Sequence, residues 1–329
     1  MNTPAIESED FFIGALDPGI RLHLREKRLR GMNRFEAVST LLMVPGRGAP
    51  GPVSFDISVP GYSWMDWMAS RGWDVWTLSF RGFGRSTKPP EMLDDPAGQP
   101  PALRGRTMVR DVAAAVAFIR ERRGVDRVNL LGWSWGTTIS PAYTADNNDS
   151  VDRLALYAPY YAYDNPARAA RFEDPTRPGE WDARRGAWSW ETEEDVRRRW
   201  WGHIPGEAHH AWRDERLARA YMDEWFDLDP EGRHRQPPAM RSPNGSLLDA
   251  YERSKNTPIY DAAKVRRPVL LIYGDQDGAS NEVEAWGLYQ KLASSPEKRY
   301  IVISGATHFF QYEFRREVLF KEVQLFLEG

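Results

Sequence analysis

The chain of 329 residues contains no cysteine, no long apolar run and no strong excess of one charge. Without cysteine it cannot form disulfides, use a thiol nucleophile or bind a metal through thiolates. No apolar run approaches the roughly 20 residues that a membrane-spanning helix needs. A net charge of -3 gives no electrostatic reason to expect a nucleic-acid partner. We therefore expect neither a nucleic-acid nor a membrane partner.

Targeting and metal-binding signals are also scarce. The first ten residues are acidic where a signal peptide would be basic and then apolar, so we expect a cytoplasmic protein. His203 and the adjacent His209 and His210 lack the H-E-x-x-H spacing, and adjacent side chains on a helix point apart. We expect no metal and no cofactor.

One pentapeptide, GWSWG at residues 132–136, is the most informative segment. It follows an apolar run and matches the nucleophile elbow G-x-S-x-G, in which a serine occupies a strained turn between a strand and a helix. The glycines are needed because side chains at those positions would collide with the neighbouring strand and helix. This context predicts that Ser134 is a nucleophile.

Two later segments supply the partners that such a serine needs, in the order acid and then histidine. An apolar strand runs into two aspartates, Asp275 and Asp277, and an alternating strand is followed by His308. Of the six histidines, His308 is the one that follows the acid strand. We predict a catalytic triad of Ser134, Asp277 and His308.

With these residues, the segments LLMVPG at 41–46 and DVWTLSFRGFGRS at 74–86 resemble the α/β-hydrolase superfamily, specifically its capped serine hydrolases. The resemblance implies an α/β fold with a mainly parallel eight-stranded sheet, flanked by helices and carrying an inserted, mostly helical cap. The family's acid is the last residue of Gly-x-x-Asp, which falls on Asp277. Asp275 is then a turn or capping residue.

Two positions depart from the family pattern: Pro45 stands where histidine is usual, and Ser79 where aspartate is usual. Neither position carries the nucleophile, base or acid, so the departures bear on the shape of the oxyanion loop. By resemblance, the oxyanion donors are the backbone N-H groups of Trp135 and Arg47. Proline forfeits a donor of its own, whereas Arg47 keeps one.

The loop after the third predicted strand also contains a decoy. Residues 46–51, GRGAPG, spell G-x-G-x-x-G. A dinucleotide site needs the third glycine to open a helix whose N-terminus meets the pyrophosphate. The nearby prolines and a non-helical pattern at residues 53–56 argue against that interpretation.

Strand and helix signals alternate along most of the chain, which is typical of β-α-β units and a parallel sheet. From about residue 160 to 261 the sequence becomes rich in arginine and aromatic residues. We predict a core domain of residues 1–158 and 263–329, and a helical cap of residues 159–262. Most of the cap aromatics are expected to form its own core and its interface with the sheet.

The predicted substrate pocket includes Arg47, Trp133, Tyr160 and Trp200, because ligand pockets are mostly apolar and aromatic. The guanidinium group of Arg47 has two possible roles. It points to solvent or pairs with a cap carboxylate, or it binds an acidic group of the substrate, since its fork of donors suits a planar anion.

The predicted reaction is hydrolysis of a carboxylic ester through an acyl-enzyme. Ser134 attacks the acyl carbon while His308 takes its proton and Asp277 orients and stabilises the imidazole. The expected substrate is a small molecule with a compact, aromatic or otherwise bulky apolar acid or alcohol. Epoxide or haloalkane hydrolysis would require an acid in the position of Ser134.

Three alternatives stay open. The Ser-Trp-Gly elbow also resembles proline iminopeptidases, and an aminopeptidase or amidase would need acids facing the pocket, for which Glu191, Glu193 and Glu194 are candidates. A carbon-carbon bond hydrolase would use the same triad. A non-catalytic ligand-binding protein of this fold is the third alternative.

Overall fold

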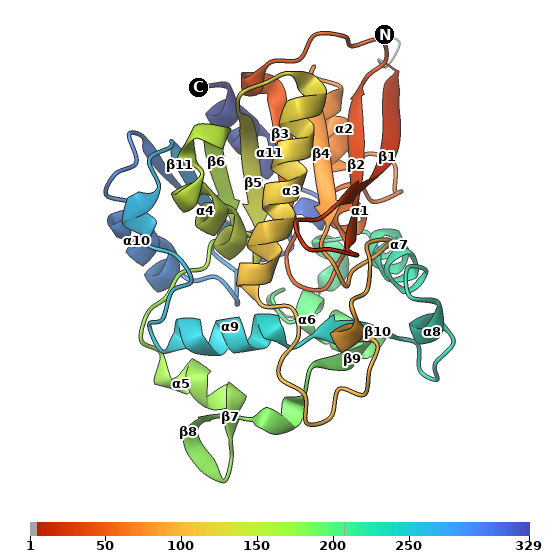
Figure 1. Ribbon diagram of the computed structural model, residues 1–329, viewed down its shortest axis with the longest axis vertical. Coiled ribbons are helices and arrows are strands. Elements are labelled where there is room, and N and C mark those ends of the chain that lie inside the picture. Colours follow the sequence, from red (N-terminus) through yellow and green to blue (C-terminus); the bar gives the residue numbers. More distant parts are fainter. Residues whose placement is uncertain (1–4, 207) are drawn as a thin grey trace.

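The computed structural model describes residues 5–206 and 208–329, and an eight-stranded sheet forms its centre (Figure 1). The strand order is β1-β2-β4-β3-β5-β6-β11-β12. β2 is antiparallel to both of its neighbours, and the other neighbouring strands are parallel. The strands are β1 (Ile6–Gly14), β2 (Arg21–Leu29), β3 (Thr40–Val44), β4 (Asp74–Ser79), β5 (Val128–Trp133), β6 (Val151–Tyr157), β11 (Val269–Gly274) and β12 (Lys298–Ile303). The expected mainly parallel sheet is confirmed.

Helices cover both faces of this sheet, which explains why its central strands are apolar throughout. Side chains alternate along β3, so Leu42 and Val44 join one buried cluster and Leu41 and Met43 join the other. The first cluster includes residues of α3 (Gly105–Arg123), α4 (Gly136–Asp146) and α10 (Glu282–Lys291). The second includes residues of α1 (Gly51–Phe55), α2 (Trp64–Ala69) and α11 (Glu317–Glu328).

The short helix α1 corrects the expectation that residues 53–56 are non-helical. Residues 51–55 form one helical turn with Pro52 near its start, where a missing N-H costs no helical hydrogen bond. A Cβ atom at Gly51 would lie 2.3 Å from the carbonyl oxygen of Leu78 in β4. The glycine therefore serves the close contact of this helix with the sheet.

The segment predicted as the cap lies at the end of the sheet where the parallel strands terminate (Figure 1). It contains two small antiparallel sheets, the β7–β8 hairpin and the pair of β9 with β10, and is therefore less purely helical than expected. Its elements are α5 (Pro166–Ala169), β7 (Glu173–Asp174), β8 (Arg177–Trp181), β9 (Trp188–Thr192), α6 (Glu193–Trp201), α7 (Glu215–Phe226), α8 (Pro230–Arg233), β10 (Ala239–Pro243) and α9 (Gly245–Ser254).

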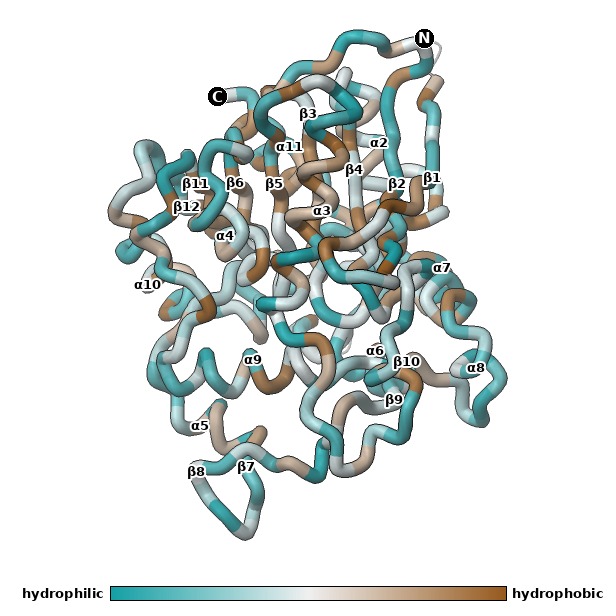
Figure 2. Tube along the Cα trace, viewed as in Figure 1, coloured by the Kyte–Doolittle hydropathy of each residue, from teal (hydrophilic) through white to brown (hydrophobic). Residues whose placement is uncertain are grey.

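Hydrophobic residues are concentrated along the central strands, whereas the β7–β8 hairpin is mostly hydrophilic (Figure 2). Cap aromatics such as Trp200, Tyr221 and Trp225 belong to the same buried cluster as α2 and α11. These side chains therefore join the segment predicted as the cap to the sheet. No helix in the described part of the chain is long and apolar enough to cross a membrane.

Candidate active site

Ser134 occupies the turn between β5 and α4 with a φ of 55°, a conformation that side chains rarely adopt. A Cβ atom at Gly132 would lie 2.5 Å from the carbonyl oxygen of Gly136, and one at Gly136 would lie 2.4 Å from that of Val44. Both contacts are too close for any side chain, so the predicted need for two glycines is confirmed. The turn presents Ser134 at the carboxyl end of β5.

The structure brings Ser134, His308 and Asp277 together. His308 Nε2 lies 2.8 Å from Ser134 Oγ, and His308 Nδ1 lies 2.8 Å from Asp277 Oδ2. All three side chains are buried. They follow β5, β12 and β11, whose carboxyl ends meet at one edge of the sheet.

Hydrogen bonds from neighbouring elements hold the histidine loop in place. The carbonyl oxygen of His308 accepts hydrogen bonds from Trp133 Nε1 at 3.1 Å and from the Tyr157 hydroxyl at 2.8 Å. The same hydroxyl accepts one from the backbone N-H of Phe310 at 2.8 Å. Trp133 and Tyr157 lie at the ends of β5 and β6, so the sheet itself fixes the position of His308.

The two competing aspartates have different partners. Asp277 Oδ1 accepts hydrogen bonds from the backbone N-H groups of Ala279 and Ser280, both at 2.8 Å, in addition to facing His308. This network fixes the carboxylate that faces the imidazole.

Asp275 instead ties the acid loop to the histidine loop. It accepts hydrogen bonds from the backbone N-H of Gly305 at 2.7 Å and from the hydroxyl of Ser304 at 3.0 Å. Burial alone would raise the pKa of Asp275, but these hydrogen bonds lower it. Asp275 therefore occupies the structural position that the Gly-x-x-Asp pattern implied.

The loop that contains Pro45 and Arg47 lies directly against the nucleophile. A Cβ atom at Gly46 would lie 3.0 Å from Ser134 Cβ and 3.5 Å from Ser134 Oγ. Within residues 5–206 and 208–329, the backbone N-H groups of Arg47 and Trp135 donate no hydrogen bond to another group. These are the two N-H groups that the family resemblance implies as oxyanion donors.

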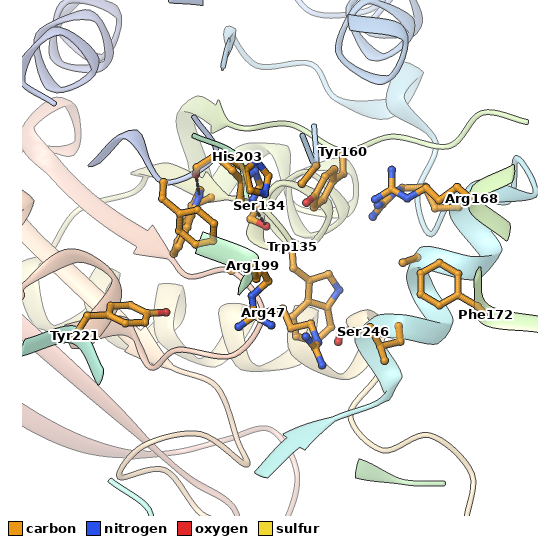
Figure 3. Close-up of a pocket in the computed structure, with 18 residues that line it drawn as sticks. Arg47, Ser134, Trp135, Tyr160, Arg168, Phe172, Arg199, His203, Tyr221 and Ser246 are labelled. Carbon is orange, nitrogen blue, oxygen red and sulfur yellow. Dashed lines mark hydrogen bonds between the residues drawn. The ribbon is translucent and has the colours of Figure 1, made fainter. Parts of the chain in front are cut away.

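A cavity of about 190 Å³ opens onto Ser134 and His308 (Figure 3). Arg47, Trp133 and Tyr160 line it, as expected. The expectation for Trp200 is wrong: this side chain is outside the described lining and is 1% exposed. Its ring packs against Tyr221 of α7, with ring centroids 4.8 Å apart, and so contributes to the interface between cap and core.

His203, from the loop after α6, also lines this cavity. Its Nδ1 atom accepts a hydrogen bond from the backbone N-H of Gly278 at 2.8 Å, so the neutral ring carries its proton on Nε2. The ring stacks on His308, with centroids 5.6 Å apart. Burial, followed by the nearby His308, lowers the pKa of His203 to about 4. No motif in the sequence marks this residue.

Arg47 contacts a cap carboxylate, one of the two roles foreseen for it. Its Nη2 atom lies 2.6 Å from Glu191 Oε1, and Arg199 Nη1 lies 3.0 Å from Glu191 Oε2. Burial would raise the pKa of Glu191, but Arg199 and Arg47 lower it to about 2. Glu191 is therefore ionised at neutral pH.

A second group of two arginines and one glutamate lies at another part of the cavity. Arg168 Nη1 lies 2.9 Å from Glu284 Oε2, and Arg253 Nε lies 2.9 Å from Glu284 Oε1. Arg253 also lies over the ring of Tyr160, with its Cζ atom 4.0 Å from the ring centroid. No sequence motif marks this group, because its members come from α5, α9 and α10.

Acids that could bind an ammonium group are missing from the described lining, in which no residue is Asp or Glu. Glu193 and Glu194 are exposed and pair with Arg197 and Arg198. Glu191, the third candidate, is shared by two arginines. The pocket acids expected for an aminopeptidase are therefore not found there.

The histidines considered as metal ligands do not converge. His209 and His210 lie in a short 3-10 helix, and the ring of His209 stacks on Trp201. Among the described residues, no group of three or more His, Asp or Glu side chains could hold a metal ion.

The sequence matches a family model described as the alpha/beta hydrolase fold over residues 39–314. Similar solved structures include an enol-lactonase from Burkholderia xenovorans, with 18% identity, a TM-score of 0.63 and coverage of 97% of this chain and 100% of that chain. A structure from a study of carboxylesterases of Nitrososphaera gargenis has 14% identity, a TM-score of 0.63 and coverage of 96% and 97%. A mutant of potato epoxide hydrolase has 18% identity, a TM-score of 0.64 and coverage of 98% and 99%. At these identities the structural likeness concerns the fold alone. No curated protein matches the sequence.

Proposed function

This chain belongs to the α/β hydrolase fold family, and we propose that it is a serine hydrolase that cleaves a carboxylic ester of a compact substrate through an acyl-enzyme. The observation that carries this proposal is the continuous line of contacts from Ser134 Oγ to His308 Nε2 and from His308 Nδ1 to Asp277, each 2.8 Å long. A nucleophile, a base and an orienting acid in this order are the parts that serine hydrolysis needs.

In the proposed reaction, Ser134 Oγ attacks the ester carbonyl while His308 Nε2 takes the hydroxyl proton. Asp277 stabilises the imidazolium that forms. The N-H groups of Arg47 and Trp135 donate to the oxyanion, and each such donor contributes about 3 to 4 kcal/mol in other hydrolases. His308 then gives the proton to the leaving alcohol, and a water molecule activated by the same base releases the acid from Ser134.

Several observations favour an ester over the substrates of other members of this fold. Epoxide hydrolysis of the kind named for the potato enzyme would need a carboxylate nucleophile, and this chain has Ser134 in the elbow. The cavity of about 190 Å³ is smaller than the roughly 300 to 1,000 Å³ of most ligand sites, which favours a compact substrate. Trp133, Tyr160 and Phe172 offer it an aromatic surface.

The alternatives differ in the support that remains. An aminopeptidase would need a free carboxylate in the lining, and none is present among the described residues. Carbon-carbon bond hydrolysis would use the same three residues and stays an alternative. The complete set of contacts at Ser134 favours catalysis over simple ligand binding.

Reaction with a fluorophosphonate tests this proposal. The reagent should label the wild-type protein once, at Ser134, and the Ser134→Ala variant should remain unlabelled in intact-mass analysis. Ser246→Ala is a matched control, because Ser246 lines the same cavity but faces no base, and this variant should be labelled like the wild type. Equal labelling of Ser134→Ala and the wild type would rule out Ser134 as the nucleophile.

A further inference from the structure

Positive charge exceeds negative charge in the cavity wall. Four arginines line the cavity, and among the described lining residues there is no acid. The carboxylates nearest to them, Glu191 and Glu284, lie behind the lining, and each is shared by two arginines. Each group of two arginines and one glutamate therefore has one guanidinium group whose charge is not balanced within the group.

We define the first pair as Arg47 and Arg199, and the second pair as Arg168 and Arg253. Arg199 and Arg168 each donate one hydrogen bond to their glutamate, through Nη1, and their other side-chain donors make no hydrogen bond among the described residues. Arg47 and Arg253 lie 2.6 Å and 2.9 Å from their glutamates. Arg47 Nε is buried and has no hydrogen-bond partner among the described residues. Arg253 is only 6% exposed, and its Nε atom, although close to Glu284, makes no aligned hydrogen bond.

Unpaired guanidinium donors in a buried wall are costly unless a ligand satisfies them. The shared glutamate raises the pKa of one arginine in each group, Arg199 and Arg168, against the opposing effect of burial. Burial lowers the pKa of the other arginine, Arg47 or Arg253, and the charge of its partner adds to this effect. A bound anion would supply the missing counter-charge to each pair.

The two pairs flank the nucleophile from different directions. In Figure 3, Arg47 and Arg199 lie together on one side of Ser134, and Arg168 lies on another side, beyond Tyr160. Arg47 directly follows Gly46, where a Cβ atom would lie 3.5 Å from Ser134 Oγ. Arg253 stacks on Tyr160, whose ring in turn stacks on His308 at 5.9 Å between centroids. A compact ester bound at Ser134 would therefore lie between the two pairs.

We infer that the substrate is a compact ester or lactone that carries a carboxylate on each side of the scissile bond, one for each arginine pair. A planar carboxylate matches the fork of donors on a guanidinium group. This inference rests on the proposed function for the bond that is cleaved, but the two carboxylate sites themselves can be tested without turnover. It also replaces the expectation of a mainly apolar substrate.

Two isosteric pairs of esters measure the preference for charge on each side of the bond. On the acyl side, the 4-nitrophenyl monoester of glutarate is compared with that of glutaramate, in which an amide replaces the carboxylate. On the alcohol side, 4-acetoxybenzoate is compared with 4-acetoxybenzamide. Because a hydrogen bond to a charged group is stronger than one to a neutral group, kcat/KM should favour each carboxylate about 10- to 100-fold.

Variants then assign each preference to one arginine pair. Arg199→Gln and Arg168→Gln should each abolish the preference for the carboxylate on one side of the bond and keep it on the other side. Neither variant strands a carboxylate, because Glu191 keeps Arg47 and Glu284 keeps Arg253. Arg197→Gln is the matched control, since Arg197 lies on the same helix as Arg199 but pairs with Glu193 and Glu215.

Binding to the Ser134→Ala variant separates this inference from the proposed function. Glutarate should raise the Tm of this variant, glutaramide should not, and Arg168→Gln in the same background should reduce the shift. If the wild-type protein hydrolyses the amides as well as the carboxylates, and glutarate leaves the Tm unchanged, the inference is wrong while the hydrolase proposal stands. If glutarate binds but no ester is cleaved and Ser134 is not labelled, the proposed function is wrong while the carboxylate sites stand.

Discussion

The core and cap walls of the cavity are built in different ways. In the core wall, Ser134, Asp277 and His308 follow parallel strands, and backbone groups hold their loops. In the cap wall, arginines and glutamates hold each other. Each group also includes one residue of the core domain, Arg47 or Glu284, which lies far from its cap partners in the sequence. A residue at the end of a strand can therefore be recognised from a short sequence motif. A binding surface made of ion pairs between distant residues has no motif in the sequence.

The sharpest test of the core wall compares its two aspartates. Asp277→Asn should lower kcat by at least 100-fold, because loss of the orienting acid costs about 10⁴-fold in a serine protease. Asp275→Asn should cost less than about tenfold, since an amide oxygen can still accept the hydrogen bond from Gly305. Steady-state kinetics on one neutral ester checks both values, and the reverse ranking would move the acid to Asp275.

The cap wall can be destabilised at Glu191, the carboxylate shared by the first arginine pair. Glu191→Gln leaves Arg47 and Arg199 facing each other without a counter-charge, and removing one partner of a buried ion pair typically costs about 3 to 5 kcal/mol. The control is Glu193→Gln, which removes a more exposed pair with Arg197 and should cost less than about 1 kcal/mol. Urea denaturation at pH 7 measures the free energy of unfolding.

An equal loss in these two glutamate variants would contradict the view that the buried group holds the cap wall together. If only Glu191→Gln loses stability, and added glutarate restores that stability, the result would instead support this view. In that case the added anion and the lost glutamate would play the same electrostatic role toward the arginine pair.

The core wall could be predicted almost completely from the sequence. The elbow glycines are fixed by contacts that no side chain could make, and the strand order brings Ser134, Asp277 and His308 to one edge. The separation of Asp277 from Asp275 followed from the family pattern, and the hydrogen bonds at each residue agree with it.

The cap wall could be predicted only in part. Contact of Arg47 with a cap carboxylate was one of the roles left open for it, and the identity of its partner, Glu191, depends on the position of β9. Trp200 was misplaced because the rotation of α6 depends on its packing against α7 and not on a local pattern. The pair of Arg168 and Arg253 depends on Glu284, which lies 31 residues beyond Arg253 in the sequence.

The two walls meet at His203, which accepts a hydrogen bond from the backbone N-H of Gly278 and stacks on His308. Its pKa in the folded protein is about 4, below the ordinary value near 6.5. Between these values the unfolded chain binds a proton that the folded protein does not bind. The free energy of unfolding therefore falls as the pH falls from about 6.5 toward 4.

The smallest expected effect is the part of the acid-induced loss of stability that is due to His203. Each pH unit within the window is worth about 1.4 kcal/mol, so lowering the pH from 7 to 5 should cost the wild type about 2 kcal/mol more than the His203→Asn variant. Asparagine has no ionisable group, and its side-chain oxygen can still accept the hydrogen bond from Gly278. The exposed His210, replaced in the same way, provides the control and should leave the wild-type pH dependence unchanged. Urea denaturation of the three proteins at both pH values gives the comparison. If the wild type and His203→Asn lose the same stability, the imidazole is not held neutral at this junction, and the cap would contribute only its shape to the core wall.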